Sequence, residues 1–210
     1  MSDPSDRIIG LYDENAEAWA ALRGSTLHEK EWIDRFMALV RPGGSILDIG
    51  CGSGEPVARY LLEQGYRVTG LDSSAALIRI CEKRFPGAEW LVGDMRSLDL
   101  CRRFDGVLAW HSFFHLPPED QREMFARFAA HAKHGAPLMF TSGPRHGVAM
   151  GEWQSEPLYH ASLAPDEYRS LLAASGFAVE SFKAGEPVAL GPSVWIARQM
   201  RPASGLDGSA

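Results

Sequence analysis

A predicted strand that runs directly into a glycine-rich turn is the feature that most restricts how this chain folds. The strand is Ser45–Ile49, the turn contains Gly50, Gly52 and Gly54, and Pro56 then stands near the first turn of a helix. Glycine permits positive φ and lets a ligand approach the backbone closely. In open parallel sheets, ligands bind at the carboxyl ends of the strands. The sequence therefore predicts an α/β fold with a ligand site around this turn, in preference to a purely structural turn.

Segments of strand length and helix length alternate along the rest of the chain. Such alternation indicates right-handed crossovers and a mostly parallel sheet. Two helices are predicted before the first strand, and the last two strands are close enough to pair as an antiparallel edge. The predicted helices cover residues 6–22, 29–40, 56–64, 75–85, 119–132 and 165–175, and the further strands cover 67–71, 89–92, 104–110, 136–142, 177–182 and 194–199.

The length and composition of the chain fit one domain. With 210 residues, of which 45% are apolar and 23% charged, the chain can bury one sizeable core. We expect a single domain over residues 1–200. Residues 143–164 include Trp153 and Tyr159 and are too long for a simple connection, so they predict a lid or substrate loop. Residues 201–210 lack periodicity and predict a disordered tail.

Charge and cysteine content argue against several classes of protein. The net charge of -6 disfavours a nucleic-acid partner, because phosphate binding needs clustered basic residues. Cys51, Cys81 and Cys101 have no paired spacing, so neither a disulfide framework nor a zinc site is predicted. No signal-like segment and no run of about 20 apolar residues is present. We therefore expect a cytoplasmic monomer or homodimer with no membrane partner.

Acidic residues around the glycine turn favour a cationic cofactor over a dinucleotide. Glu55 stands at the helix start, where the pyrophosphate of NAD would bind. S-adenosylmethionine carries a sulfonium and an ammonium group, which suit the charge of Asp48. Asp72 follows the second strand, about 20 residues past the turn, and can accept hydrogen bonds from the ribose hydroxyls of either cofactor.

A second acidic position follows the third predicted strand, in Gly93-Asp94-Met95. The Asp94 carboxylate can accept a hydrogen bond from the exocyclic amine of adenine, and the Met95 thioether can lie against the ring. The structural alternative is that Asp94 caps the turn that follows.

In their order and spacing, these motifs and the later segment Phe104–Ala109 resemble the small-molecule branch of the class I S-adenosylmethionine-dependent methyltransferases. The resemblance covers nearly the whole chain. It implies a Rossmann-like sheet of seven strands in the order 3-2-1-4-5-7-6, with helices on both faces and N-terminal cap helices at about 6–40. It also implies S-adenosyl-L-methionine as cofactor, S-adenosyl-L-homocysteine as product, and a small-molecule substrate.

The resemblance assigns cofactor contacts to particular residues. Tyr12, Trp19 and Arg23 belong to the leading helix and close over the cofactor, with Arg23 reaching the cofactor carboxylate. For Tyr12 and Trp19 the alternative is core packing at helical spacing. The other implied contacts are Asp48, Gly50, Cys51 and Gly52 at the methionine moiety, Asp72 and Ser73 at the ribose, Asp94 and Met95 at adenine, and Ala109 and Trp110 over the sulfonium.

Two histidines are the candidates for catalysis. Methyl transfer from a sulfonium is an in-line displacement, so the enzyme mainly needs alignment and an unprotonated nucleophile. His115 follows the fourth strand and can act as a base or orient the substrate, unless it only bonds to backbone. His160, in the predicted lid, is the second candidate. His111 and His115 have a spacing that suits a metal, but no third ligand accompanies them, so no metal site is predicted.

The methyl acceptor is not specified by the sequence. Aromatic residues near the site, including Trp110, Phe113 and Phe114, suit a flat or apolar molecule, and many ligands fit that description. Two other classes compete with a methyltransferase. A nicotinamide-dependent oxidoreductase would prefer glycine where Glu55 stands, and a binding protein without catalysis would share the same motifs. Residues 109–112 lack the Asn-Pro-Pro-Tyr pattern of amino-methylating enzymes, which disfavours DNA, RNA and glutamine as substrates.

Overall fold

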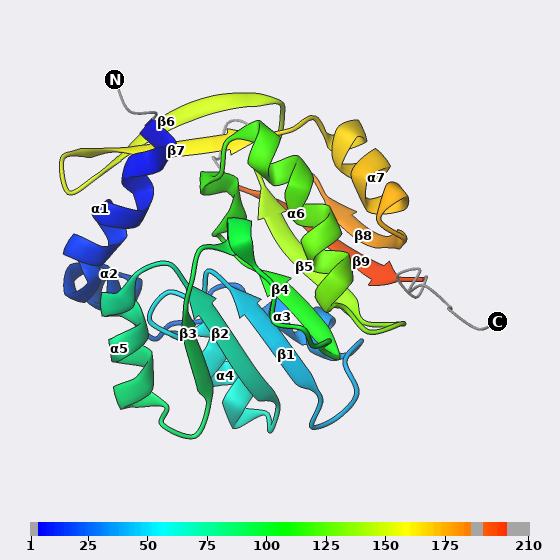
Figure 1. Ribbon diagram of the computed structural model, residues 1–210, viewed down its shortest axis with the longest axis horizontal. Coiled ribbons are helices and arrows are strands. Elements are labelled where there is room, and N and C mark those ends of the chain that lie inside the picture. The colour runs from blue at the N-terminus through cyan, green and yellow to red at the C-terminus, as the bar shows by residue number, and fades with distance from the viewer. Residues whose placement is uncertain (1–3, 186–190, 201–210) are drawn as a thin grey trace.

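A seven-stranded sheet forms the centre of the computed structural model, which describes residues 4–185 and 191–200 (Figure 1). Its order is β3-β2-β1-β4-β5-β9-β8; β9 runs antiparallel to both β5 and β8, and the other neighbouring strands are parallel. The predicted order is confirmed, because β8 and β9 are the two terminal strands expected at the antiparallel edge. The strands are β1 (Ser45–Ile49), β2 (Arg67–Asp72), β3 (Glu89–Val92), β4 (Gly106–Ala109), β5 (Pro137–Ser142), β8 (Phe177–Lys183) and β9 (Ser193–Gln199).

Helices cover both faces of this sheet. Side chains alternate along β1, so Leu47 and Ile49 join one apolar cluster while Ile46 joins the other. The first cluster is completed by α6 (Pro118–His131) and α7 (Pro165–Ala174) on one face, as Figure 1 shows. The opposite face carries α3 (Lys30–Met37), α4 (Val57–Glu63) and α5 (Ala75–Arg84).

The N-terminal segment predicted as one helix over 6–22 is broken at Asn15. The side-chain amide of Asn15 donates a hydrogen bond to the Leu11 carbonyl at 2.9 Å. Local bonds of this kind compete with the backbone ladder of a helix. The segment forms η1 (Pro4–Arg7), α1 (Ile8–Glu14) and α2 (Ala16–Arg23).

A carboxylate of α1 attaches these N-terminal helices to the sheet layer. The Asp13 side chain accepts hydrogen bonds from the Ser74 hydroxyl and the Ala76 N–H, both at 2.8 Å. Both donors lie at the start of α5. The N-terminal helices are therefore held beside the end of β2, above the carboxyl edge of the sheet.

Residues 143–164, expected as a loop, form a β-hairpin. Its strands are β6 (Gly147–Trp153) and β7 (Glu156–Ser162), which pair only with each other. Gln154 and Ser155 form the turn with φ of 54° and 62°, values typical of the two-residue turn that matches strand twist. The loop interpretation was wrong because the glycines and Pro157 masked the strand pattern. In Figure 1 the hairpin lies along the N-terminal segment.

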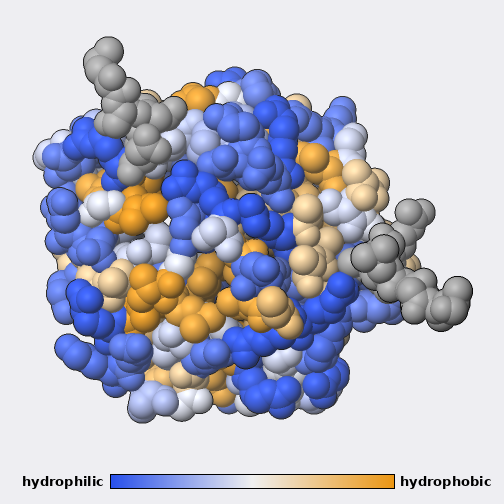
Figure 2. All heavy atoms as spheres, in the orientation of Figure 1, coloured by the Kyte–Doolittle hydropathy of each residue, from blue (hydrophilic) through white to orange (hydrophobic). Residues whose placement is uncertain are grey.

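Other boundaries differ by a few residues. The predicted strand 104–110 is shorter in the structure, with Phe104 in an isolated bridge to Ala132 and Trp110 past the end of β4. Between β3 and β4 the chain forms only η2 (Met95–Ser97). Figure 2 shows apolar residues gathered over the region of β2 and β3, where Val92 is 58% exposed. The tail predicted over 201–210 lies outside the described residues, and within them no helix has the length and apolarity to cross a membrane.

Candidate active site

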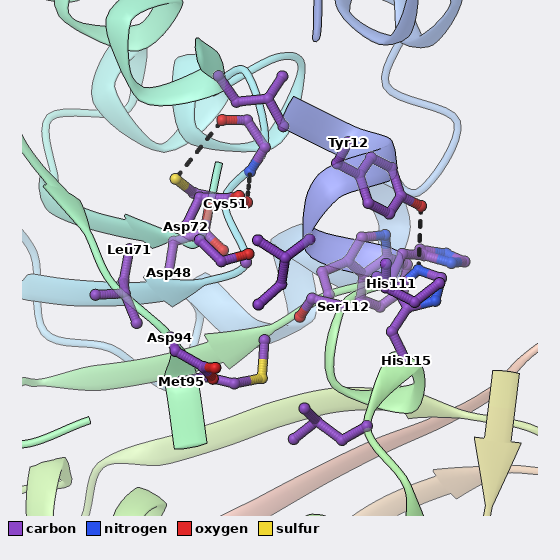
Figure 3. A pocket seen from close by; sticks show the side chains of 18 of the residues that line it. Tyr12, Asp48, Cys51, Leu71, Asp72, Asp94, Met95, His111, Ser112 and His115 are labelled. Carbon is purple, nitrogen blue, oxygen red and sulfur yellow. Dashed lines mark hydrogen bonds between the residues drawn. The ribbon is translucent and has the colours of Figure 1, made fainter. Parts of the chain in front are cut away.

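A pocket opens at the carboxyl ends of β1, β2 and β4 and is roofed by the N-terminal helices. Figure 3 shows carboxylates on one side of it and histidines with a tyrosine on the other. Of the predicted site residues, the pocket is lined by Tyr12, Trp19, Arg23, Asp48, Gly50, Cys51, Gly52, Asp72, Ser73, Asp94, Met95, Trp110 and His115. Two predicted residues do not line it: Ala109 is fully buried in the core, and His160 lies behind the pocket wall.

The glycine turn forms the floor of the pocket and needs its glycines. The N–H groups of Gly50 and Cys51 both donate to the Leu71 carbonyl, at 2.7 and 3.1 Å. Gly50 has φ of 75°, and a Cβ there would lie 2.2 Å from the Cβ of Ser112. The turn is thus pressed against the segment that follows β4, and only glycine fits this position.

Two carboxylates stand side by side at the turn, Asp48 buried and Asp72 half-buried. Asp48 is 3% exposed, and burial, together with the charge of Asp72, raises its pKa to about 7. Asp72 accepts hydrogen bonds from the N–H groups of Gly52 and Ser74, at 2.8 and 2.9 Å. No described residue donates a hydrogen bond to the Asp48 carboxylate. This end of the pocket therefore carries negative charge that a cationic ligand would satisfy.

Asp94 and Met95 lie on the lower wall of the pocket in Figure 3. Asp94 caps η2 through the Arg96 N–H at 2.8 Å and pairs with the Arg96 guanidinium at 2.6 Å. The capping alternative is therefore observed, and the carboxylate also faces the pocket. Met95 reaches the glycine turn, because its methyl carbon would lie 3.5 Å from a Cβ at Gly50.

Two aromatic side chains roof the pocket, and a third packs on them from the hairpin. Tyr12 and Trp19 pack edge to face at 5.1 Å between centroids, and Trp153 of β6 stacks on Tyr12 at 5.8 Å. Trp153 also meets Trp19 at 5.6 Å. Tyr12 and Trp19 therefore serve both expected roles, because they line the pocket and pack in a cluster with the hairpin.

His115 connects this roof to the hairpin. Its Nδ1 lies 2.8 Å from the Tyr159 carbonyl, which can only accept, so Nδ1 carries the proton. Its Nε2, 3.1 Å from the Tyr12 hydroxyl, then accepts from that group. Burial lowers the pKa of His115 to about 3, so the ring is neutral at ordinary pH. Both nitrogens are engaged, which favours the structural alternative for His115.

His160 belongs to the same cluster of rings. Its ring centroid lies 4.8 Å from that of His115 and 5.1 Å from that of Phe114. Its Nδ1 lies 3.1 Å from the Leu158 carbonyl. No group of three or more His, Cys, Asp or Glu side chains in residues 4–185 and 191–200 is arranged to hold a metal ion.

Arg23 lines the pocket, and it forms an ion pair with a residue that the sequence did not indicate. Its guanidinium pairs with Glu29, and the same carboxylate oxygen accepts from the Trp110 indole N–H at 3.1 Å. Glu29 stands at the start of α3 with no distinctive motif around it. His111 and Ser112 were likewise not predicted as site residues, although both line the pocket directly after β4.

Glu55 lines the pocket, as expected from its place after the turn, but its charge is balanced. Arg59, one helical turn on, pairs with it, with the Arg59 Nε at 2.8 Å from the carboxylate. The repulsion that Glu55 exerts on a phosphate is therefore weaker than the sequence suggested. The preference for a cation rests on Asp48 and Asp72.

The sheet order and this pocket together define a Rossmann-like protein with a nucleoside-type site at the carboxyl ends of its strands. A family model described as "Methyltransferase domain" matches residues 46–135. A dTDP-3-amino-3,6-dideoxy-alpha-D-glucopyranose N,N-dimethyltransferase from Streptomyces fradiae is 35% identical over 137 residues, covering 62% of this chain and 51% of that protein. A demethylmenaquinone methyltransferase from Thermotoga maritima is 33% identical over 110 residues, covering 49% of this chain and 48% of that protein. The chain thus spans about half the length of these two relatives.

Solved structures agree with the fold. A 1,6-didemethyltoxoflavin-N1-methyltransferase from Burkholderia thailandensis has a TM-score of 0.73 at 19% identity, covering 96% of this chain and 92% of that one. An amino pentose methyltransferase from Micromonospora echinaspora has a TM-score of 0.67 at 20% identity, covering 88% and 96%. Residues 46–135 thus match a methyltransferase-domain family, and the fold of the chain is that of these solved methyltransferases.

Proposed function

We propose that the protein transfers the methyl group of S-adenosylmethionine to a small-molecule acceptor. The observation that carries this proposal is the carboxylate pair facing the pocket, buried Asp48 beside half-buried Asp72, where Asp48 has no described hydrogen-bond donor. A buried carboxylate without a partner is costly, and a ligand ammonium relieves that cost. S-adenosylmethionine supplies such a cation together with an electrophilic methyl group.

Each part of the cofactor has residues that suit it. Asp48 and the backbone of the glycine turn would hold the amino-acid end. Asp72 accepts one backbone bond on each oxygen, so each oxygen retains a lone pair for a ribose hydroxyl. Asp94 and Met95 would face adenine. Arg23 would reach the cofactor carboxylate by exchanging its contact with Glu29.

The competing classes fit the pocket less well. NAD would bring a pyrophosphate to the turn beside Asp48 and Asp72, where two carboxylates repel it. A binding protein without catalysis would need the same residues, and turnover separates the two. The two relatives carry names with different acceptors, an amino sugar and a quinone precursor, so neither acceptor is assigned to this chain. A small-molecule substrate, a cytoplasmic location and a monomeric or dimeric state remain predictions.

Calorimetry with four ligands tests the cofactor assignment. S-adenosylmethionine and S-adenosylhomocysteine should bind, and NAD should not. Asp48→Asn should weaken both sulfur ligands but leave 5′-methylthioadenosine unchanged, because that ligand lacks the ammonium group. Asp72→Asn should weaken the binding of S-adenosylmethionine, S-adenosylhomocysteine and 5′-methylthioadenosine alike, by about 1–3 kcal/mol for a charge-assisted bond.

A remote carboxylate provides the control. Asp166 is fully exposed on α7, and Asp166→Asn should change none of these affinities. Tight binding of NAD with no response to either sulfur ligand would reject the assignment. A screen of small acceptors with labelled S-adenosylmethionine then tests for turnover.

A further inference from the structure

His111 is held rigidly at the junction between β4 and the glycine turn. Its backbone has φ of 51°, and its N–H donates to the Thr141 hydroxyl at 2.9 Å. The next residue, Ser112, donates its hydroxyl to the Ile49 carbonyl at 2.6 Å. Left-handed conformations are sparsely populated by residues other than glycine and persist where the surroundings hold them, often at functional sites.

The imidazole of His111 is packed on its faces and free at its nitrogens. Trp110 and Phe114 meet the ring edge to face, at 5.0 and 5.9 Å between centroids. No residue in the described part of the chain makes a hydrogen bond to either nitrogen. The ring lines the pocket, and Figure 3 places it beside Ser112, across from the carboxylates. The residue is exposed, so its nitrogens are accessible to a ligand in the pocket.

The other histidines near the pocket do not share this state. His115 uses one nitrogen for the Tyr159 carbonyl and the other for the Tyr12 hydroxyl. His160 packs behind His115 and does not line the pocket. His111 is therefore the histidine of this group with a lone pair open to the pocket.

The surroundings of His111 leave its ring neutral. The residue is exposed at the pocket, and the desolvation that the pocket walls impose lowers its pKa to about 4, with Arg23 and His160 acting in the same direction and Glu29 against it. A neutral imidazole has one donating and one accepting nitrogen. The accepting nitrogen needs a ligand group that carries a proton.

We propose that His111 hydrogen-bonds the methyl acceptor and takes its proton, so the acceptor is a protic nucleophile, either a hydroxyl or an uncharged amine. This inference rests on the proposed function.

The step balances in atoms and charge. The acceptor's O–H or N–H bond breaks and its proton passes to the free imidazole nitrogen of His111. A lone pair of the acceptor atom forms the bond to the methyl carbon, the electron pair of the broken O–H or N–H bond stays on that atom, and the pair of the methyl–sulfur bond remains on sulfur. The single positive charge thus moves from the sulfonium to the imidazolium, which faces the carboxylate of Glu29, and solvent then removes the proton.

Binding of matched small probes tests the inference without turnover. The protein saturated with S-adenosylhomocysteine is titrated with phenol or anisole, and with aniline or N,N-dimethylaniline, while the ring protons of the histidines are followed by NMR. Each pair differs in the presence of the proton that His111 is to accept. We expect the His111 signals to shift with phenol or aniline, and the protic member to bind about 2- to 10-fold more tightly than its methylated partner.

Two substitutions separate hydrogen bonding from proton transfer. Glycine and asparagine both tolerate the left-handed backbone. His111→Gly should abolish the difference within each pair. His111→Asn keeps an accepting oxygen and should preserve that difference, yet lower kcat about 100-fold for any acceptor found by the screen, because it cannot take a proton. His146→Asn, at an exposed bend, should change neither quantity.

The outcomes distinguish this inference from the proposed function. Absence of S-adenosylhomocysteine binding by the wild-type protein overturns both. Normal binding of that ligand, with equal affinities inside both probe pairs or with shifts confined to His115, overturns the role of His111 alone. A kcat of His111→Asn within threefold of wild type would overturn proton transfer.

Discussion

At the scale of single residues, the site holds side chains whose protonation differs from that in water, and a glycine whose backbone conformation other residues rarely adopt. Asp48 is held in a site that favours its neutral form, and Gly50 has a backbone and a contact that no other residue accepts. His115 is neutral because it is buried and bonded on both nitrogens. Each of these conditions makes a measurable prediction.

Cofactor affinity should depend on pH through Asp48. Its pKa of about 7 in the free protein means that the carboxylate is mostly protonated below neutrality. A cationic ligand binds the ionised form, so affinity for S-adenosylmethionine should rise as pH increases and level off above about 7. Below that point it should fall by about tenfold per pH unit. Calorimetry between pH 5.5 and 7.5 measures the slope, and a flat profile in wild type would contradict this role for Asp48.

The same group should reduce the stability of the free protein at high pH. The pKa of Asp48 is raised on folding from 3.8, so its stabilising contribution is complete below about pH 4 and is lost as pH rises through 7. Asp48→Asn should therefore raise the free energy of unfolding at pH 8 by up to about 4 kcal/mol, since each pKa unit corresponds to about 1.36 kcal/mol. Denaturant unfolding of both proteins at pH 5 and pH 8 checks this. If the difference in unfolding free energy between Asp48→Asn and wild type is the same at both pH values, the prediction is contradicted.

Gly50 and Gly65 form a matched pair for the glycine turn. Both have positive φ, of 75° and 82°, but a Cβ at Gly65 meets nothing within 4 Å while one at Gly50 meets Ser112. Gly65→Ala should cost about 1 kcal/mol of stability and leave cofactor binding intact. Gly50→Ala should displace Ser112 and abolish detectable binding. Equal effects of the two substitutions on binding would contradict the close packing of the turn.

At the scale of elements, the sequence predicted those whose pattern is local and missed one whose stability comes from its surroundings. The strand at 45–49 and the turn after it carry their own signals, glycine and a run of apolar residues. The β6–β7 hairpin carries few, because six of the seven residues of β6 are exposed and its alternation is weak. Its position is set by Trp153 packing on Tyr12, and by the Tyr159 carbonyl on His115. Contacts over such sequence distances leave no local pattern.

Trp153 should therefore anchor the hairpin to the roof. Trp153 is 9% exposed, whereas Met150 in the same strand is 51% exposed. Trp153→Ala should speed amide hydrogen exchange throughout β6 and β7 and weaken cofactor binding, because Tyr12 and Trp19 lose a packing partner. Met150→Ala should leave both unchanged. Equal exchange rates in the two variants would show that the hairpin is held by other contacts.

At the scale of the whole molecule, the sheet order followed from the alternation of elements and from the resemblance, and the pocket followed from the strand order. Thirteen of the fifteen predicted site residues line that pocket. The two exceptions have different causes. Ala109 points into the core because β4 is covered on both faces, and His160 lies on a hairpin whose register the sequence did not reveal. Glu29 was missed because its role depends on Arg23 and Trp110 meeting it in space.

The hairpin leaves the body of the protein and returns to it at almost the same point. The Gly143 N–H donates to the Ser162 hydroxyl at 2.6 Å, which closes the base of the excursion. Because its ends meet, the length and sequence of the intervening ribbon can change at a small entropic cost, without altering the sheet or the floor of the pocket. The glycine turn that lines the pocket and the hairpin that packs on its roof are thus encoded in separate stretches of sequence. A lineage with this architecture can vary the hairpin while the residues proposed to hold the methyl donor stay the same.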